Sequence, residues 1–281
     1  MAAARGLVWV DGRLTPAHEA VVPALDHGLT VGDGVFETCK VTAGVPFALT
    51  RHLARLGRSA AGLGLPAPED DLVRSAVTQV LAASPLERGR VRITWTGGPG
   101  PLGSDRADVR PTLVVAAQPA AAAPAAPGVV VVPWTRNERS ATAGLKTTSY
   151  AENVVALAHA RARGASEALL ANTRGELCEG TGSNVVVELD GELLTPPLSS
   201  GCLAGITREL LLQWAEEEGL PVREADIVVD ELPRIEVLLL TSSSRDVQPQ
   251  AHLDGRPLAR TALCDAAVEL FARRGADDVD P

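Results

Sequence analysis

The stretch GLKTTSY, residues 144–150, places one lysine, Lys146, among small and hydroxyl-bearing residues. Only two of the 26 basic residues in this chain are lysines, and the other one is Lys40. Arginine serves as well as lysine on a solvated surface, but it cannot form an imine with an aldehyde. A lysine retained in such a composition is a candidate for chemistry, although an exposed loop lysine or chance retention would give the same pattern.

The residues after Lys146 predict a helix over 149–163, because Ser149 and Glu152 match a capping box and Gly164 can end the helix. Lys146 would then lie just before a helix start. Farther out in this half of the chain, hydrophobic patterns predict further elements. The strands are expected at 129–133, 167–171, 185–189, 192–195 and 237–241, and the helices at 206–218 and 261–274.

The N-terminal half predicts a hairpin over 6–15 around Asp11-Gly12. Further strands are expected at 35–41, 45–49, 91–96 and 112–117, and helices at 51–63 and 70–81. Most strands are joined by hairpins, with helices interspersed. This order favours an α+β fold over a doubly wound parallel sheet.

Residues 116–128 read AAQPAAAAPAAPG and divide the chain. Three prolines argue against a helix there, and no large apolar side chain is present. The prediction is an N-terminal domain at 1–118, a Pro/Ala-rich linker at 119–128 and a C-terminal domain at 129–281.

Composition disfavours several classes of function. The net charge is −9 and no long basic run occurs, so nucleic acids and anionic membranes are not expected partners. Neither a signal-peptide core nor an apolar stretch of membrane-spanning length is seen. The four cysteines are far apart and form no CxxC, which predicts reduced thiols in a cytoplasmic protein and no metal site; they are Cys39, Cys178, Cys202 and Cys264.

Three other motifs could carry chemistry. In LCEGTGSN, residues 177–184, the carboxylate of Glu179 could pair with a pyridine nitrogen and make the ring an electron sink, although a solvated turn would look the same. GCLAGITR, residues 201–208, opens a helix whose N-terminus suits a phosphate. HLARL, residues 52–56, offers Arg55 as a phosphate partner or as a surface residue.

Together these motifs resemble the fold-type IV pyridoxal-phosphate (PLP) enzymes, also called class IV aminotransferases. The resemblance rests on GDGVFET at 32–38, HLARL at 52–56, GLK at 144–146, EGTGSN at 179–184 and GITRELL at 205–211, and it covers about residues 5–275. It implies a D-amino-acid aminotransferase-like fold, with a small N-terminal α/β domain, a larger C-terminal mixed α/β domain and PLP between them. It also implies a homodimer.

The resemblance also implies roles for individual residues. Lys146 is similar to the Schiff-base lysine and proton shuttle of the family, Glu179 to the partner of the pyridine nitrogen, and Leu203 to the residue that packs on the cofactor ring. The residues implied in phosphate binding are Arg55, Ile206, Thr207 and Ser243. Substrate contacts are predicted for Phe36, Thr38 and Arg106.

Three activities within the family remain open. The GDGVFET and GLKTTSY motifs look most like 4-amino-4-deoxychorismate lyase, which forms p-aminobenzoate and pyruvate for folate synthesis. A D-amino-acid aminotransferase is disfavoured, because Phe36 stands where those enzymes have a tyrosine and residues 94–106 lack their histidine. A branched-chain or (R)-amine transaminase stays open, because loops set the pocket. An inactive PLP-fold binding protein is the non-enzyme alternative, and the intact Lys146 and Glu179 argue against it.

Overall fold

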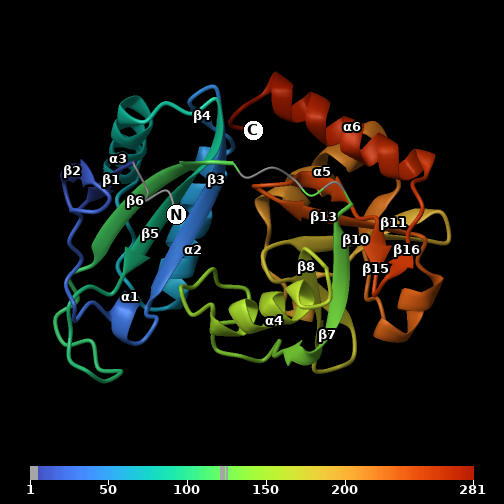
Figure 1. Ribbon diagram of the computed structural model, residues 1–281, viewed down its shortest axis with the longest axis horizontal. Helices are drawn as coiled ribbons and strands as arrows, with labels where there is room; N and C mark the ends of the chain where they lie inside the picture. The colour runs from blue at the N-terminus through green and yellow to red at the C-terminus, as the bar shows by residue number, and fades with distance from the viewer. Residues whose placement is uncertain (1–5, 121–123, 125) are drawn as a thin grey trace. The chain divides into compact units, whose positions relative to one another are not determined.

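A computed structural model describes residues 6–120, 124 and 126–281 (Figure 1). The chain forms two compact units. Unit 1 comprises Met1–Ala121, Leu145–Tyr150 and Val279–Pro281, and unit 2 comprises Ala122–Gly144 and Ala151–Asp278. This division differs from the predicted one, which assigned Lys146 and the residues around it to the C-terminal domain.

Unit 1 is built on an antiparallel six-stranded sheet in the order β2-β1-β6-β5-β3-β4. Its strands are β1 (Leu7–Val10), β2 (Arg13–Pro16), β3 (Gly34–Thr42), β4 (Val45–Pro46), β5 (Arg88–Thr96) and β6 (Thr112–Pro119). The helices are the short α1 (His27–Thr30), α2 (Leu49–Gly62) and α3 (Asp70–Ala83). Side chains alternate along a strand, so Val35, Cys39 and Val41 of β3 share one face and pack into the core with apolar residues of α2 and α3.

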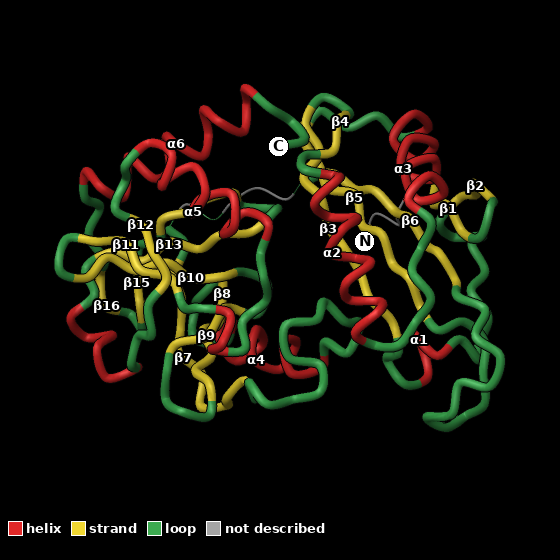
Figure 2. Tube along the Cα trace, turned by 180° about the vertical axis from the view of Figure 1, so that it is seen from behind, coloured by secondary structure: helices red, strands yellow, loops and turns green. Residues whose placement is uncertain are grey.

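Unit 2 contains two five-stranded sheets, in the orders β12-β11-β10-β13-β14 and β16-β15-β7-β8-β9 (Figure 2). The strands are β7 (Gly128–Arg136), β8 (Glu167–Asn172), β9 (Leu177–Gly180), β10 (Asn184–Leu189), β11 (Glu192–Thr195), β12 (Val222–Glu224), β13 (Val237–Ser242), β14 (Asp246–Pro249), β15 (His252–Leu253) and β16 (Arg256–Pro257). The helices are α4 (Ala151–Arg161), α5 (Ile206–Glu218) and α6 (Ala262–Asp277), with 3-10 turns at Leu198–Ser200 and Val229–Arg234. One apolar cluster joins the sheets, for example through Leu169 and Val185.

The α+β arrangement is confirmed, and α5 has the predicted bounds. Two local predictions are wrong. The strand expected at 45–49 stops at Pro46, because Leu49 already begins α2. The helix expected at 149–163 spans Ala151–Arg161, so Ser149 lies two residues before the helix, where its hydroxyl donates to the Gly32 carbonyl (2.9 Å).

The predicted linker is shorter than its composition suggests, because β6 includes Pro119 and β7 begins at Gly128. Residues 121–123 and 125 of that linker lie outside the described residues. None of the described helices has the length and apolar character that crossing a membrane requires.

Candidate active site

Lys146 belongs to unit 1 because its segment pairs with the edge of β3. The Phe36 N–H donates to the Lys146 carbonyl (3.0 Å), and the Thr148 N–H donates to the Gly34 carbonyl (2.8 Å). The Lys146 N–H donates to the hydroxyl of Ser59 on α2 (3.2 Å). The backbone of the lysine is therefore held by both a strand and a helix.

Two hydroxyls lie close to Lys146 in the GLKTTSY stretch. The hydroxyls of Thr148 and Ser149 both donate to the Gly32 carbonyl at 2.9 Å, so they hold the backbone of the GDG turn. A Cβ on Gly34 would lie 3.0 Å from the Trp95 carbonyl oxygen, which explains the glycine there. The GDGVFET and GLKTTSY motifs thus meet at one edge of the sheet.

The amine of Lys146 lies against aromatic rings. Its Nζ is 4.4 Å from the ring centroid of Phe36 and 6.0 Å from that of Tyr150, and the two rings meet edge to face at 5.1 Å. The Arg92 guanidinium stacks on the Phe36 ring with Cζ 3.6 Å from the centroid. Cations near aromatic faces are attracted by the ring quadrupole. Two cationic side chains therefore share the Phe36 ring.

Arg92 and Tyr150 were not predicted as site residues. Arg92 lies opposite Thr38 in the β3–β5 pairing, so the predicted substrate residue Thr38 has this arginine as its cross-strand neighbour. Burial lowers the pKa of Arg92. The sequence offers little sign of Arg92, because arginine is common throughout the chain. Tyr150 is the chain's only tyrosine and lies within the GLKTTSY stretch, which could have identified it.

Arg55 lies in a buried cluster with Glu37 and His52. Its Nε and Nη2 each donate to one oxygen of Glu37 at 2.7 Å, and His52 Nδ1 lies 2.6 Å from Glu37 Oε2. All three residues are buried. Burial alone would raise the pKa of Glu37, but Arg55 and His52 hold it well below its ordinary value. The guanidinium predicted to bind phosphate is thus fixed by a carboxylate of the FET motif.

His52 should give the protein a measurable pH dependence of stability. Burial lowers the pKa of His52 below its ordinary value of 6.5, so the unfolded chain takes up a proton more readily than the folded protein. This contribution to stability is present above pH 6.5 and is lost as the pH falls below it. His52→Asn keeps an N–H donor for Glu37 but cannot be protonated.

The measurement is urea unfolding of the cofactor-free protein at about pH 7.5 and about pH 5.5. The wild-type free energy of unfolding is expected to fall more between these pH values than that of His52→Asn. An equal fall in both proteins would show that His52 does not cause the dependence. His18→Asn is the matched control, because His18 lies on the surface and its side chain is 72% exposed.

In unit 2, Glu179 lies on β9 and is held from two sides. Its Oε2 accepts a hydrogen bond from the Leu203 N–H (2.9 Å). Its Oε1 lies 3.2 Å from Arg136 Nε, a charge contact that lacks the geometry of a hydrogen bond. The backbone of Leu203 therefore positions Glu179, and Arg136 stabilises the negative charge of Glu179. Arg136 could not be singled out from the sequence, because arginine is common throughout the chain.

The predicted phosphate residues of unit 2 lie at a helix start and in a turn. Ile206 and Thr207 are buried in the first turn of α5, and the N-cap residue Gly205 has no side chain that could accept from the amides there. Such amides attract phosphate. A Cβ on Gly205 would lie 1.9 Å from Asn184 Oδ1, so only glycine fits. Ser243 lies in the turn between β13 and β14.

Arg106, a predicted substrate contact, is bound in unit 1 by the GDG motif. Its Nε and Nη2 donate to the two oxygens of Asp33 at 2.6 and 2.7 Å. The hydrogen bond to Asp33 raises the pKa of Arg106. Nearby, His27 Nε2 lies 2.8 Å from the Pro101 carbonyl oxygen. These contacts tie the loop at 97–106 to the GDG turn, and the contact of Arg106 with substrate stays a prediction.

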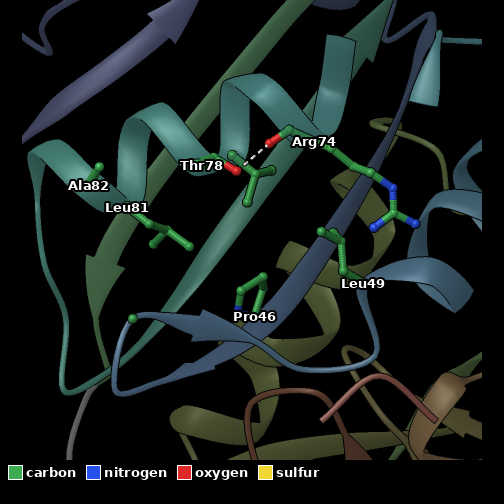
Figure 3. A pocket seen from close by; sticks show the side chains of 8 residues that line it. Pro46, Leu49, Arg74, Thr78, Leu81 and Ala82 are labelled. Atoms are coloured by element: carbon green, nitrogen blue, oxygen red, sulfur yellow. Dashed lines mark hydrogen bonds between the residues drawn. The ribbon is translucent and has the colours of Figure 1, made fainter. Parts of the chain in front are cut away.

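A pocket of about 500 Å³ in unit 1 lies elsewhere, between β4, α2 and α3 (Figure 3). Its walls are mostly apolar, and Arg74 extends beside it (Figure 3). The lining residues are Gly44, Pro46, Leu49, Arg74, Val77, Thr78, Leu81 and Ala82. None of them is a predicted site residue.

The two groups of residues suit PLP. Unit 1 offers the amine of Lys146 against aromatic rings and the fixed guanidinium of Arg55. Unit 2 offers the anchored carboxylate of Glu179 and a helix start with no side-chain cap from Gly205. An aldehyde, a pyridine nitrogen and a phosphate are the groups that such residues would bind.

Comparison with known proteins agrees with this chemistry. The family model for amino-transferase class IV matches residues 34–253. The chain is 31% identical over 255 residues to a putative branched-chain-amino-acid aminotransferase of Methanocaldococcus jannaschii, covering 89% of this chain and 88% of that protein. It is 31% identical over 285 residues to a bifunctional aminodeoxychorismate lyase / D-amino acid transaminase of Mycobacterium tuberculosis, covering 94% of this chain and 96% of that protein.

A solved 4-amino-4-deoxychorismate lyase from Pseudomonas aeruginosa superimposes with a TM-score of 0.84. It is 31% identical, and the match covers 98% of this chain and 100% of that one. The relatives thus include both lyases and transaminases. The chain belongs to the class IV amino-transferase family of PLP-dependent enzymes.

Proposed function

We propose that this enzyme is a 4-amino-4-deoxychorismate lyase, which splits its substrate into p-aminobenzoate and pyruvate. The observation that supports this choice is the surface beside Lys146. The Phe36 ring lies 4.4 Å from Lys146 Nζ, and the Arg92 guanidinium is stacked on the same ring. An aromatic surface with an added cation suits a cyclic substrate that carries two carboxylates.

In this proposal PLP, when bound, supplies an electron sink for the charge left by proton removal. Lys146 would hold the cofactor covalently until the substrate amine takes its place, and Nζ would then be free to remove the proton from the substrate carbon that bears the amino group. Nζ returns a proton to the departing enolpyruvate, which leaves as pyruvate. Phe36 and Tyr150 exclude water on their side of the amine, and Arg92 orients a carboxylate.

Glu179 is proposed to hold a proton at the pyridine nitrogen. Arg136 and the Leu203 N–H keep the carboxylate in place. Arg55, the α5 start at Ile206 and Thr207, and Ser243 are proposed to bind the phosphate.

The choice of activity is tested by a paired assay on the purified, PLP-loaded enzyme. One arm supplies 4-amino-4-deoxychorismate and follows the fluorescence of p-aminobenzoate. The other supplies branched-chain or D-amino acids with 2-oxoglutarate or pyruvate and follows amino-group transfer. Fast p-aminobenzoate formation with little transfer would support the lyase.

A transaminase is the second candidate, favoured by the similarity to the M. jannaschii protein. Brisk transfer without p-aminobenzoate would establish it and overturn the lyase proposal, while the roles of Lys146 and Glu179 would stand. We also propose a cytoplasmic homodimer, as the family resemblance implies. Light scattering at several protein concentrations tests the dimer, and a mass of one chain would exclude it.

Glu179→Gln is expected to lower turnover about 100-fold or more, because a neutral amide cannot hold a proton at the pyridine nitrogen. Initial rates with saturating PLP measure this loss. Glu152→Gln is the matched control, because Glu152 also contacts Arg136 (3.3 Å) but is 75% exposed. Equal activity of both variants would remove Glu179 from the mechanism.

A further inference from the structure

Unit 2 contains a buried carboxylate, Glu167, that no proposed step uses. It begins β8 and is 1% exposed. Its Oε1 accepts from the N–H groups of Ala168 (3.1 Å) and Thr181 (3.2 Å) and from the Thr181 hydroxyl. Its Oε2 accepts from the Ser183 hydroxyl (3.3 Å) and from Arg245 Nη1 (2.6 Å). A buried charge with so many donors joins the segments that supply them.

The first of these segments is the turn that directly follows Glu179. The Gly180 N–H donates to the Ser183 carbonyl (2.8 Å), which closes the turn. A Cβ on Gly180 would lie 2.4 Å from Ser183 Oγ and 3.3 Å from Glu167 Cγ. A side chain at position 180 would therefore displace the Ser183 hydroxyl, which donates to the carboxylate.

Asn184, the residue after this turn, is connected to Glu179 through the backbone of Leu203. Asn184 Nδ2 donates to the Leu203 carbonyl (2.8 Å), and the Leu203 N–H donates to Glu179 Oε2 (2.9 Å). Displacing the turn would therefore move Glu179 and its anchor together.

The second segment is the serine turn, residues 242–245. The Arg245 N–H donates to the Ser242 carbonyl (3.1 Å), and the Arg245 side chain, 27% exposed, reaches Glu167. Ser243 lies inside this turn. One carboxylate thus connects the turn after Glu179 with the turn that contains Ser243.

We propose that Glu167 is a positioning residue that sets the geometry of both segments toward PLP. The proposal rests on the proposed roles of Glu179 and Ser243. A simpler role, in which Glu167 only neutralises the charge of Arg245, predicts the opposite result. Removing a neutralising carboxylate would leave the charge of Arg245 uncompensated and strengthen phosphate binding, whereas removing a positioning residue weakens phosphate binding.

The test uses cofactor-free protein and 4′-deoxypyridoxine 5′-phosphate, which lacks the aldehyde and therefore reports binding without the Lys146 bond. Glu167→Gln is expected to weaken binding of this analogue about tenfold, because hydrogen bonds to a charged group are lost. Binding of the unphosphorylated analogue, 4′-deoxypyridoxine, is expected to weaken as well, because the turn that follows Glu179 is also displaced. In addition, the absorption band of the bound analogue reports whether the pyridine nitrogen is protonated. The pH at which this band changes is expected to differ between Glu167→Gln and the wild-type protein.

Glu192→Gln is the matched control, because it removes a carboxylate from a surface ion pair with Arg223 (2.7 Å) and should change neither affinity nor spectrum. Tighter or unchanged binding of the phosphorylated analogue to Glu167→Gln would overturn the proposal. If that variant fails to fold, Thr181→Val and Ser183→Ala each remove one donor, and unchanged affinity and spectrum in both would overturn it equally. Failure of the wild-type protein to bind the analogue would instead overturn the proposed cofactor site itself.

Discussion

Lys146→Ala is expected to lose the visible absorption band of the bound cofactor and at least about 1,000-fold of turnover. The physical reason is that one amine performs two roles. The amine forms the covalent bond to the cofactor aldehyde, and its Nζ then moves the proton. Absorption spectra and initial rates of the PLP-loaded variant measure both losses.

The chain provides its own control for this experiment, because Lys40 is the only other lysine. Lys40 also lies over an aromatic ring, with Nζ 4.8 Å from the centroid of Phe47. Lys40→Ala should therefore keep the band and the activity. Borohydride reduction followed by mass spectrometry should find the cofactor on Lys146, and its attachment to Lys40 would contradict the proposed site.

Arg55→Met is expected to destabilise the cofactor-free protein by about 3–5 kcal/mol, because it leaves a buried carboxylate without its main partner. Glu37 is completely buried and receives two hydrogen bonds of 2.7 Å from Arg55, beside the single 2.6 Å contact with His52 Nδ1. Denaturant unfolding without PLP measures this loss independently of phosphate binding.

The double variant Arg55→Met with Glu37→Gln should recover much of that stability, because it removes both charges together. PLP affinity should stay low in the double variant, because the phosphate partner is still absent. Arg260→Met breaks a surface ion pair with Asp265 and should leave the unfolding midpoint nearly unchanged. A double variant no more stable than Arg55→Met would contradict the paired-charge explanation.

Much of this architecture follows from local sequence. Hydrophobic patterns located α5 to the residue, and the Asp11-Gly12 turn located the hairpin β1–β2. Motif order predicted Lys146 and Glu179 as site residues, and their roles stay predictions. The short strands β9, β12 and β14–β16 were missed, because two to four residues carry too little periodic pattern.

The site residues that were not predicted were missed for a different reason. Glu37 and His52 meet the predicted Arg55 because a strand face and a helix face pack together, and that contact is not encoded at any single spacing. Arg92 and Arg136 look like the other arginines of the chain until their partners are known. Lys146 joined unit 1 because its segment pairs with a strand more than one hundred residues earlier in the chain.

That pairing has a consequence for synthesis on the ribosome. Gly34 and Phe36 at the start of β3 lie opposite Thr96 and Thr94 of β5, and their own backbone groups bond to the Lys146–Thr148 segment on the other side. A nascent chain that has not yet reached residue 145 therefore presents these backbone groups as an open strand edge, which other chains can extend. The segment that carries the lysine also closes this edge, so the backbone groups of Gly34 and Phe36 gain these partners only after residues 146–148 have left the ribosome.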